Sequence, residues 1–334
     1  MSNNLTLEDK IKLIRNIAIV AHVDHGKTTL VDMLLQQSGT FAAHSQTVER
    51  VMDSNDLEKE RGITILSKNT GLRWKEFRIN IVDTPGHADF GGEVERVLSM
   101  VDSVLLLVDA VDGPMPQTGF VTKKALQAGL RPIVVINKVD RDGARPDWVL
   151  DQTFDLFDRL GADENQLDFP VVYASAIQGW ATEDLSNKTD NMDTIFETII
   201  NNVAAPKVDP NGNLQIQVSA LSYSSYVGLI GTGRIRRGQV KKGQSVSIGS
   251  VDGSVRQGKV LQIMNFHGLD KQEVDEASAG DIVAISGLGE LKISDTICEQ
   301  GKLEILEKLS VDEPTISMVI QVNDSPFAGQ EGKL

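Results

Sequence analysis

Five short apolar runs, rich in β-branched residues, recur in the first two thirds of the chain and are separated by stretches of helical character. They cover residues 17–20, 79–82, 104–108, 133–136 and 171–174. A strand that is apolar on both faces is typical of a parallel sheet covered by helices on both sides. The alternation of strand and helix from Asn16 to about residue 205 therefore predicts an α/β domain with a mostly parallel sheet.

Two of the intervening stretches carry apolar residues three and four positions apart, as one face of an amphipathic helix requires. The first set is Val94, Val97, Leu98 and Val101, and the second is Leu150, Phe154 and Phe157. Both sets predict helices. Residues 177–192 have no clear period and are expected to form a loop or insertion.

The pattern changes after Ala205-Pro206, where short alternating runs replace the helices. They predict strands at residues 215–219, 233–237, 245–248, 259–264 and 281–285, separated by glycine turns at Arg237-Gly238, Lys242-Gly243, Asp252-Gly253 and Ala279-Gly280. Such spacing predicts a small β-barrel or sandwich. We therefore expect the α/β domain over 1–206, an all-β barrel domain over 207–308, and the start of a third, truncated domain over 309–334.

Composition limits the class of protein. The formal net charge of −14 disfavours long-range attraction to nucleic acid, so any RNA contact needs a local basic patch. The single cysteine, Cys298, excludes an intrachain disulfide. The N-terminal residues lack the apolar core of a signal peptide, and the most apolar run, 104–110, is too short to span a bilayer. These features predict a cytoplasmic protein, expected to be a monomer without a membrane or DNA partner.

A phosphate-binding loop is predicted where the first apolar run ends and a helix begins. The loop reads Ala21-His22-Val23-Asp24-His25-Gly26-Lys27-Thr28, with alanine where the general pattern has its first glycine. Backbone N–H groups of such a loop point at phosphate at the positive end of a helix. Lys27 is expected to reach the β- and γ-phosphates, and the Thr28 hydroxyl is expected to bind Mg²⁺. The expected phosphate contacts are Asp24, His25, Gly26, Lys27, Thr28, Thr29 and Gly86.

A second motif, Asp83-Thr84-Pro85-Gly86-His87, follows the second apolar run directly. An aspartate at this strand end can hold a metal-bound water, and the Gly86 N–H can meet a γ-phosphate because no side chain blocks the approach. Between the two motifs lies Glu60-Arg61-Gly62-Ile63-Thr64-Ile65, where Thr64 could complete the Mg²⁺ shell when a γ-phosphate is present. The expected metal site is thus Thr28, Thr64 and, through water, Asp83.

A third motif, Asn137-Lys138-Val139-Asp140, predicts that the base is guanine. The Asp140 carboxylate can accept bonds from N1–H and the exocyclic amine of guanine, neither of which adenine offers. Asn137 can tie this loop to the phosphate loop, and the Lys138 stem can lie over the purine. Ser175-Ala176, after the fifth apolar run, can present a backbone N–H to guanine O6. In this order on one α/β scaffold, the motifs predict a P-loop GTPase.

These motifs resemble those of the translational GTPases, such as elongation factors Tu and G and LepA, which also carry a barrel next. Further stretches are similar to the BipA (TypA) family of ribosome-associated GTPases, at residues 52–61, 91–98, 112–118, 137–146 and 287–290. The resemblance implies ribosome-stimulated hydrolysis of GTP and a role in stress adaptation and ribosome assembly. That family continues past the point where this chain ends, which puts ribosome binding by this chain in doubt.

The same resemblance implies roles for individual residues. His87 is similar to the histidine that orients the attacking water, and Val23 and Ile63 resemble the apolar gate that holds this histidine back. Asp24 resembles an aspartate associated with a monovalent cation.

Three readings remain open from the sequence. The favoured one is a ribosome-activated GTPase, with ribosomal RNA and proteins as partners. A nucleotide switch with little turnover and a metabolic enzyme such as the sulfate-activating GTPase subunit are the alternatives.

A basic cluster in the predicted barrel has two possible roles: contact with ribosomal RNA, or a solvated hairpin. It consists of Arg234, Arg236, Arg237, Lys241 and Lys242.

Overall fold

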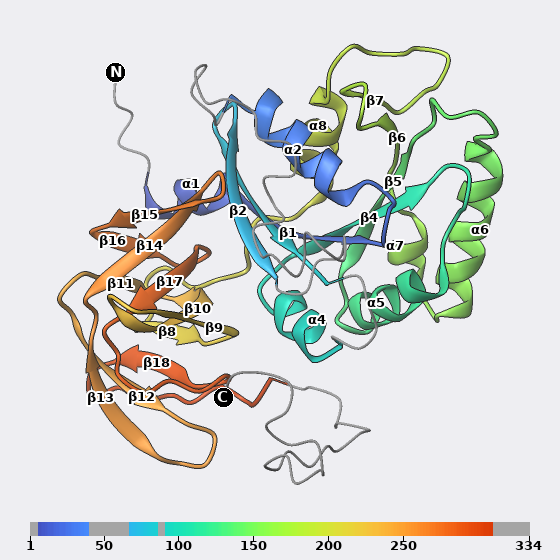
Figure 1. Ribbon diagram of the computed structural model, residues 1–334. Helices are drawn as coiled ribbons and strands as arrows, with labels where there is room; N and C mark the ends of the chain where they lie inside the picture. Colours follow the sequence, from blue (N-terminus) through green and yellow to red (C-terminus); the bar gives the residue numbers. More distant parts are fainter. Residues whose placement is uncertain (1–5, 40–66, 86–90, 310–334) are drawn as a thin grey trace, which may run out of the picture.

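The structure, a computed structural model, describes residues 6–39, 67–85 and 91–309, which form an α/β domain and a β-barrel (Figure 1). The α/β domain holds a seven-stranded sheet in the order β2-β3-β1-β4-β5-β6-β7. The five central strands, from β3 to β6, pair in parallel, and β2 and β7 are antiparallel edge strands. The strands are β1 (Ile14–Ala21), β2 (Lys68–Trp74), β3 (Phe77–Asp83), β4 (Ser103–Asp109), β5 (Arg131–Asn137), β6 (Val171–Ser175) and β7 (Trp180–Thr182). The predicted α/β fold is confirmed.

Helices cover both faces of this sheet, as its fully apolar strands require. On one face, α2 (Lys27–Gln37) and α8 (Asp193–Asn202) share a core with the strands. On the other face lie α4 (Gly91–Leu98), α5 (Pro116–Gln127) and α6 (Pro146–Arg159). Two short helices, α1 (Leu7–Lys12) and α7 (Glu164–Leu167), complete the described helices. Among the described residues, none of the helices is both long and apolar enough to traverse a bilayer.

The barrel is antiparallel and carries a nine-stranded sheet in the order β13-β12-β18-β8-β10-β17-β14-β15, with β9 on β10. A two-stranded pair, β11 with β16, accompanies it. All four predicted glycine turns have a glycine with positive φ, between 68° and 97°. The strands are β8 (Gln215–Gln217), β9 (Ala220–Ser224), β10 (Gly228–Arg237), β11 (Gln239–Lys241), β12 (Ser245–Gly249), β13 (Val255–Lys259), β14 (Gln262–His267), β15 (Asp270–Val274), β16 (Glu276–Ser278), β17 (Ile282–Ser286) and β18 (Thr296–Glu299).

Three expectations about local structure were wrong in part. Residues 177–192 contain the short edge strand β7, whose three residues are too few to establish a period. The strand expected at 259–264 is split, since β13 ends at Lys259 and β14 begins at Gln262. Phe154 lies in the predicted helix α6 but is 46% exposed, whereas Phe157 is fully buried. The strand-like run at 315–322 lies outside the described residues.

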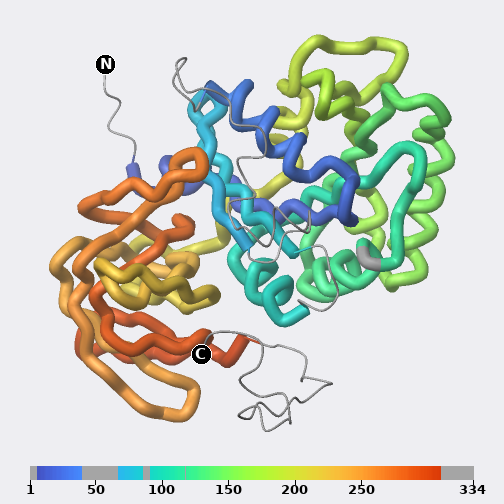
Figure 2. Tube along the Cα trace, viewed as in Figure 1, coloured from blue at the N-terminus to red at the C-terminus, as the bar shows by residue number. Residues whose placement is uncertain are grey.

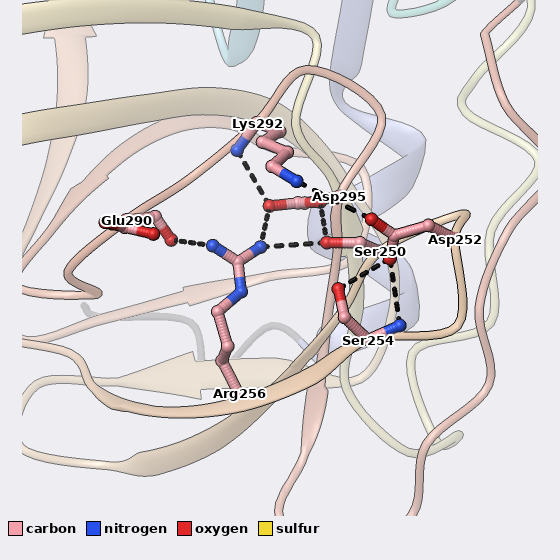
Figure 3. A network of polar contacts seen from close by, with 7 residues as sticks. All are labelled: Ser250, Asp252, Ser254, Arg256, Glu290, Lys292 and Asp295. Atoms are coloured by element: carbon pink, nitrogen blue, oxygen red, sulfur yellow. Dashed lines mark hydrogen bonds and ion pairs between the residues drawn. The ribbon is translucent and has the colours of Figure 1, made fainter.

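A polar network stabilises one end of the barrel (Figure 3). The buried Asp295 carboxylate accepts hydrogen bonds from Ser250 Oγ at 2.6 Å and from the Lys292 backbone N–H at 2.7 Å, and it pairs with Arg256. Arg256 also donates to the carbonyl oxygen of Glu290 at 2.6 Å. The network joins the β12–β13 hairpin to the loop at 287–290, so this loop is a structural part of the barrel.

Partly buried ion pairs hold the barrel against the ends of the sheet strands at which β1 and β3 begin. Arg234 Nη2 lies 2.9 Å from Asp102 Oδ1, and Arg78 Nη1 lies 2.9 Å from Asp281 Oδ1. Asn16 Nδ2 donates to the carbonyl oxygen of Gly280 at 3.0 Å. Burial raises the pKa of both carboxyl groups, and the facing arginines oppose that rise. Charges desolvated in this way require their partners, which favours one docking geometry.

The β14–β15 hairpin also lies along the edge strand β2, as the Cα trace in Figure 2 makes visible. Gly71 and Gly268 exchange two backbone hydrogen bonds, with N···O distances of 3.1 and 2.6 Å. A Cβ atom on Gly71 would lie 2.1 Å from the carbonyl oxygen of Phe266. Glycine is therefore required at Gly71 because the two backbones approach so closely.

Gly71→Ala is expected to lower the free energy of unfolding by about 1–3 kcal/mol, because the added methyl group forces the hairpin away from β2. Urea unfolding of both proteins measures the difference. Gly119→Ala in α5 is the matched control, since its Cβ would meet only Leu156 Cδ1, at 3.7 Å. This control should be neutral or stabilising by up to about 1 kcal/mol. Equal stability of Gly71→Ala and the parent would contradict the close approach.

Candidate nucleotide-binding site

The carboxyl ends of the parallel strands gather the residues of the candidate site at one edge of the sheet. The strands β1, β3, β4, β5 and β6 end at Ala21, Asp83, Asp109, Asn137 and Ser175. In an open α/β sheet, ligands bind in the crevice outside these ends. The barrel packs near the amino ends of β1 and β3, and loops surround the carboxyl ends of the strands.

The loop between β1 and α2, for which the sequence predicts phosphate binding, contains two residues with a left-handed backbone. Gly26 has φ of +92°, and a Cβ there would lie 2.6 Å from Asn137 Nδ2, so only glycine fits. Asp24 also has a left-handed backbone, with φ of 66°. The methyl group of Ala21 is buried in the sheet core, which explains how alanine is accommodated where glycine is usual. Thr28 and Thr29 lie in the first turn of α2, which begins at Lys27.

The Lys27 ammonium lies between this loop and the end of β3. Its Nζ is 2.6 Å from Asp83 Oδ1 and donates to the carbonyl oxygen of Thr84 at 2.7 Å. Thr84 Oγ1 in turn donates to the carbonyl oxygen of Ile19 at 2.8 Å, which ties this segment to β1. A buried lysine–aspartate pair therefore occupies the position where the first two motifs meet.

His25 is buried beneath the loop, with its ring edge-on to that of His22 at a centroid distance of 5.1 Å. Its Nδ1 lies 3.4 Å from the carbonyl oxygen of Leu107 in β4. Burial lowers the pKa of His25, an effect only partly offset by this contact. A neutral, packed imidazole leaves the backbone of His25 as the part available to the site.

Asn137 joins the base loop to its two neighbours. Its Nδ2 donates to the carbonyl oxygen of His25 at 2.9 Å, and its Oδ1 accepts from the Ala176 N–H at 3.0 Å. The side chain is fully surrounded, at 1% exposure for the residue. Asn137 thus brings together the phosphate loop, the base loop and the Ser175-Ala176 turn. Asp140 stands at the rim of this arrangement and is exposed.

Lys138 spans the same region from a left-handed backbone, with φ of 62°. Its Nζ donates to the carbonyl oxygen of Asp24 at 2.5 Å and lies 2.7 Å from Asp109 Oδ2. Anchoring the ammonium at both partners extends the aliphatic stem across the site. That the stem covers a purine stays a prediction.

Asp109 is a site residue that the sequence analysis missed. Its carboxylate is fully buried at the end of β4 and accepts from the Val111 N–H at 2.8 Å, besides pairing with Lys138. Burial by itself would raise the pKa of Asp109, but the hydrogen bonds from Lys138 and Val111 outweigh it and hold the pKa below its usual value. The signal was present in the sequence, since Asp109 ends an apolar strand just as Asp83 does.

Asp109→Asn is expected to lower the free energy of unfolding near pH 7 by about 1–3 kcal/mol, because it leaves the Lys138 ammonium without its buried partner. A carboxyl group with a depressed pKa stabilises the fold above its unfolded pKa of about 3.9 and loses that effect as the pH falls through the folded value. The difference between mutant and parent should therefore shrink toward pH 3. Urea unfolding across this range tests it, with exposed Asp112→Asn as control. A gap that does not depend on pH would contradict the assignment.

Several expected residues lie outside the described part of the chain: Gly86, His87, Ile63 and Thr64. The flanking residues are described and are tied together. Glu93 Oε1 in α4 accepts from the backbone N–H of Ser67 at 2.9 Å and from its Oγ at 2.7 Å. Ser67, which precedes β2, is thereby joined to α4. Val23, the other gate residue, is half-buried in the phosphate loop.

The basic cluster of the barrel is largely neutralised by acidic partners. Arg234 belongs to the domain interface described above, and Arg237 pairs with Glu304. Lys242 Nζ lies 2.5 Å from Glu273, and Lys241 Nζ lies 3.7 Å from Glu276. Because four of its five cations have a carboxylate partner, and Arg234 is taken up by the domain interface, the cluster offers little free positive charge for a phosphate.

Comparisons with known proteins agree with this architecture. The family profile of the elongation factor Tu GTP binding domain matches residues 12–205, and that of elongation factor Tu domain 2 matches residues 228–298. A solved structure of translation elongation factor SelB from Methanococcus maripaludis, in complex with the GTP analogue GppNHp, has a TM-score of 0.64 at 23% identity. It covers 86% of this chain and 55% of its own, and the likeness concerns the fold.

Curated relatives are more similar in sequence. The large ribosomal subunit assembly factor BipA of Escherichia coli (strain K12) is 64% identical over 97% of this chain and 53% of its own length. The protein of the same name from Haemophilus influenzae is 64% identical over 98% of this chain and 53% of its own. The chain thus spans about half the length of the curated relatives it matches.

Proposed function

The chain belongs to the family of the elongation factor Tu GTP-binding domain, and from this premise we propose that it binds GTP and GDP with Mg²⁺ and hydrolyses GTP. The observation that supports the proposal most directly is the link through Asn137, which hydrogen-bonds to His25 and Ala176. It connects the loop suited to phosphates with the loops suited to a guanine base. Lys27, Lys138 and Asp140 supply the charges that each end of such a nucleotide needs.

In this proposal the phosphates lie against the backbone N–H groups of residues 24–29 and of Gly86, with Lys27 supplying positive charge. Hydroxyl and carboxylate oxygens are the ligands that Mg²⁺ prefers, which suits Thr28, Thr64 and, through water, Asp83. The Asp83 side chain is only 3% exposed, and a buried carboxylate suits a cation partner. When bound, the metal would neutralise phosphate charge. Asp24, whose side chain is exposed, could add a monovalent cation.

Hydrolysis of GTP requires a water molecule held in line with the γ-phosphate. We assign that positioning to His87, and a gate over it to Val23 and Ile63. The large ribosomal subunit is the proposed partner of the full-length protein, since the curated relatives are named as its assembly factors. The proposal also includes stimulation of hydrolysis by the ribosome and a role in stress adaptation. It further includes a monomeric state and a cytoplasmic location.

Asp140→Asn is expected to weaken binding of GDP and to strengthen binding of XDP. Xanthine carries a carbonyl at C2, to which asparagine can donate, whereas guanine loses its charged acceptor. The lost interaction should cost about 1.5–3 kcal/mol, or roughly 10- to 150-fold in Kd. Competition binding with GDP and XDP measures the exchange. Unchanged GDP affinity would remove Asp140 from the base site.

His87→Ala is expected to leave GDP binding nearly intact and to abolish ribosome-stimulated hydrolysis in the full-length protein. Loss of a positioned catalytic group costs about 10²–10⁴ in rate. Affinity should change little, because the proposed contact of His87 is with water and not with the base. Single-turnover hydrolysis with and without ribosomes, beside mant-GDP binding, tests both parts. Full ribosome-stimulated turnover in the mutant would exclude the assigned role.

A further inference from the structure

The Asp140 carboxylate, which is proposed to recognise guanine, contacts a residue that lies outside the sequence motifs. Gln178 Nε2 donates to Asp140 Oδ2 at 3.4 Å. Gln178 lies in the turn between β6 and β7, two residues after Ser175-Ala176, and its backbone N–H donates to Ser175 Oγ at 3.3 Å. The turn that borders the base loop therefore also contacts the carboxylate on that loop.

The orientation of the Gln178 amide is fixed by its other partners. Its Oε1 accepts from Trp180 Nε1 at 2.9 Å and from Lys188 Nζ at 3.4 Å. Indole and ammonium groups can only donate hydrogen bonds, so the amide oxygen must face them. The NH₂ group is consequently turned toward Asp140, the only arrangement in which all three contacts are favourable.

Trp180 supplies a rigid base for this arrangement. It is buried in β7, at 6% exposure, where it pairs with Ser175 of β6. Lys188 Nζ lies 4.3 Å from the centre of the Trp180 ring, which keeps the ammonium close to the amide oxygen. The buried Trp180 thus orients the exposed Gln178 amide, which in turn contacts the Asp140 carboxylate at the rim of the site.

We propose that Gln178 is a positioning residue for guanine specificity, holding the Asp140 carboxylate in the plane that a two-point donor needs. The inference rests on the proposed guanine binding. Each carboxylate oxygen has two acceptor positions, so Gln178 can occupy one on Oδ2 and leave both oxygens open to the base. Holding an acceptor in its bound geometry lowers the ordering cost of binding.

Gln178→Ala is expected to weaken GDP binding by about two- to tenfold, the range for a single net hydrogen bond. Binding of IDP should change by less than about twofold, because hypoxanthine lacks the exocyclic amine and needs only one carboxylate oxygen. The discrimination between GDP and IDP, measured by competition against mant-GDP, is the readout that a purely structural role would leave unchanged. Leu185→Ala, on an exposed residue of the β7–α8 segment that also carries Lys188, is the control.

Gln178→Glu should weaken GDP binding further, since Trp180 and Lys188 would hold one glutamate oxygen while the other faces Asp140 with like charge. Tighter GDP binding in Gln178→Ala would identify Gln178 as a competitor for the carboxylate and overturn the proposal. So would unchanged discrimination between GDP and IDP. If Asp140→Asn still exchanges GDP for XDP in that case, guanine recognition stands and only the positioning role fails. If Asp140→Asn has no effect, both fail.

Discussion

The side-chain amide of Asn137 is the contact on which the geometry of the candidate site depends. It donates to the phosphate loop at His25 and accepts from the turn at Ala176, and it is almost completely buried. A buried amide of this kind must satisfy both of its ends, so the three loops can adopt few alternative arrangements. Gly26 belongs to the same constraint, because a side chain there would collide with the Asn137 amide.

The two ends of the parallel strands have different roles. The loops of the candidate site lie at the carboxyl ends. The barrel is held near the amino ends of β1 and β3 through Arg78, Asn16 and their partners. The charges of pairs such as Arg234–Asp102 lose hydration when they are buried. Their mutual attraction offsets this cost only when the geometry is correct. Docking of the barrel is therefore specified by polar groups, while apolar residues of β10, β14 and β17 extend the core of the α/β domain across the interface.

Sequence patterns predicted the strands that are buried on both faces and the turns that need a particular backbone conformation. The five central strands are apolar on both faces, and the glycine turns of the barrel need a positive φ, so both leave a local signature. The edge strands were missed because β2 mixes polar and apolar residues and β7 has only three residues. Phe154 fits a helical pattern that cannot distinguish the buried side from the exposed one. Asp109 left a signal that was overlooked, since it ends an apolar strand as Asp83 does. Gln178 was missed because its contacts arise between loops, and no spacing in the sequence encodes them.

Charge pairing in the site bears on how an acidic protein can bind a polyanionic nucleotide. Each lysine of the site is held by a buried carboxylate at a strand end, Lys27 by Asp83 and Lys138 by Asp109. The two pairs differ in whether they can persist when the proposed nucleotide binds. Lys138 can keep Asp109 while its stem covers the base, so that pair persists. In the proposed binding mode Lys27 turns toward phosphate, which would leave the Asp83 carboxylate buried beside further negative charge. Such a carboxylate would require a new cation, and this requirement would couple the proposed nucleotide binding to the divalent ion.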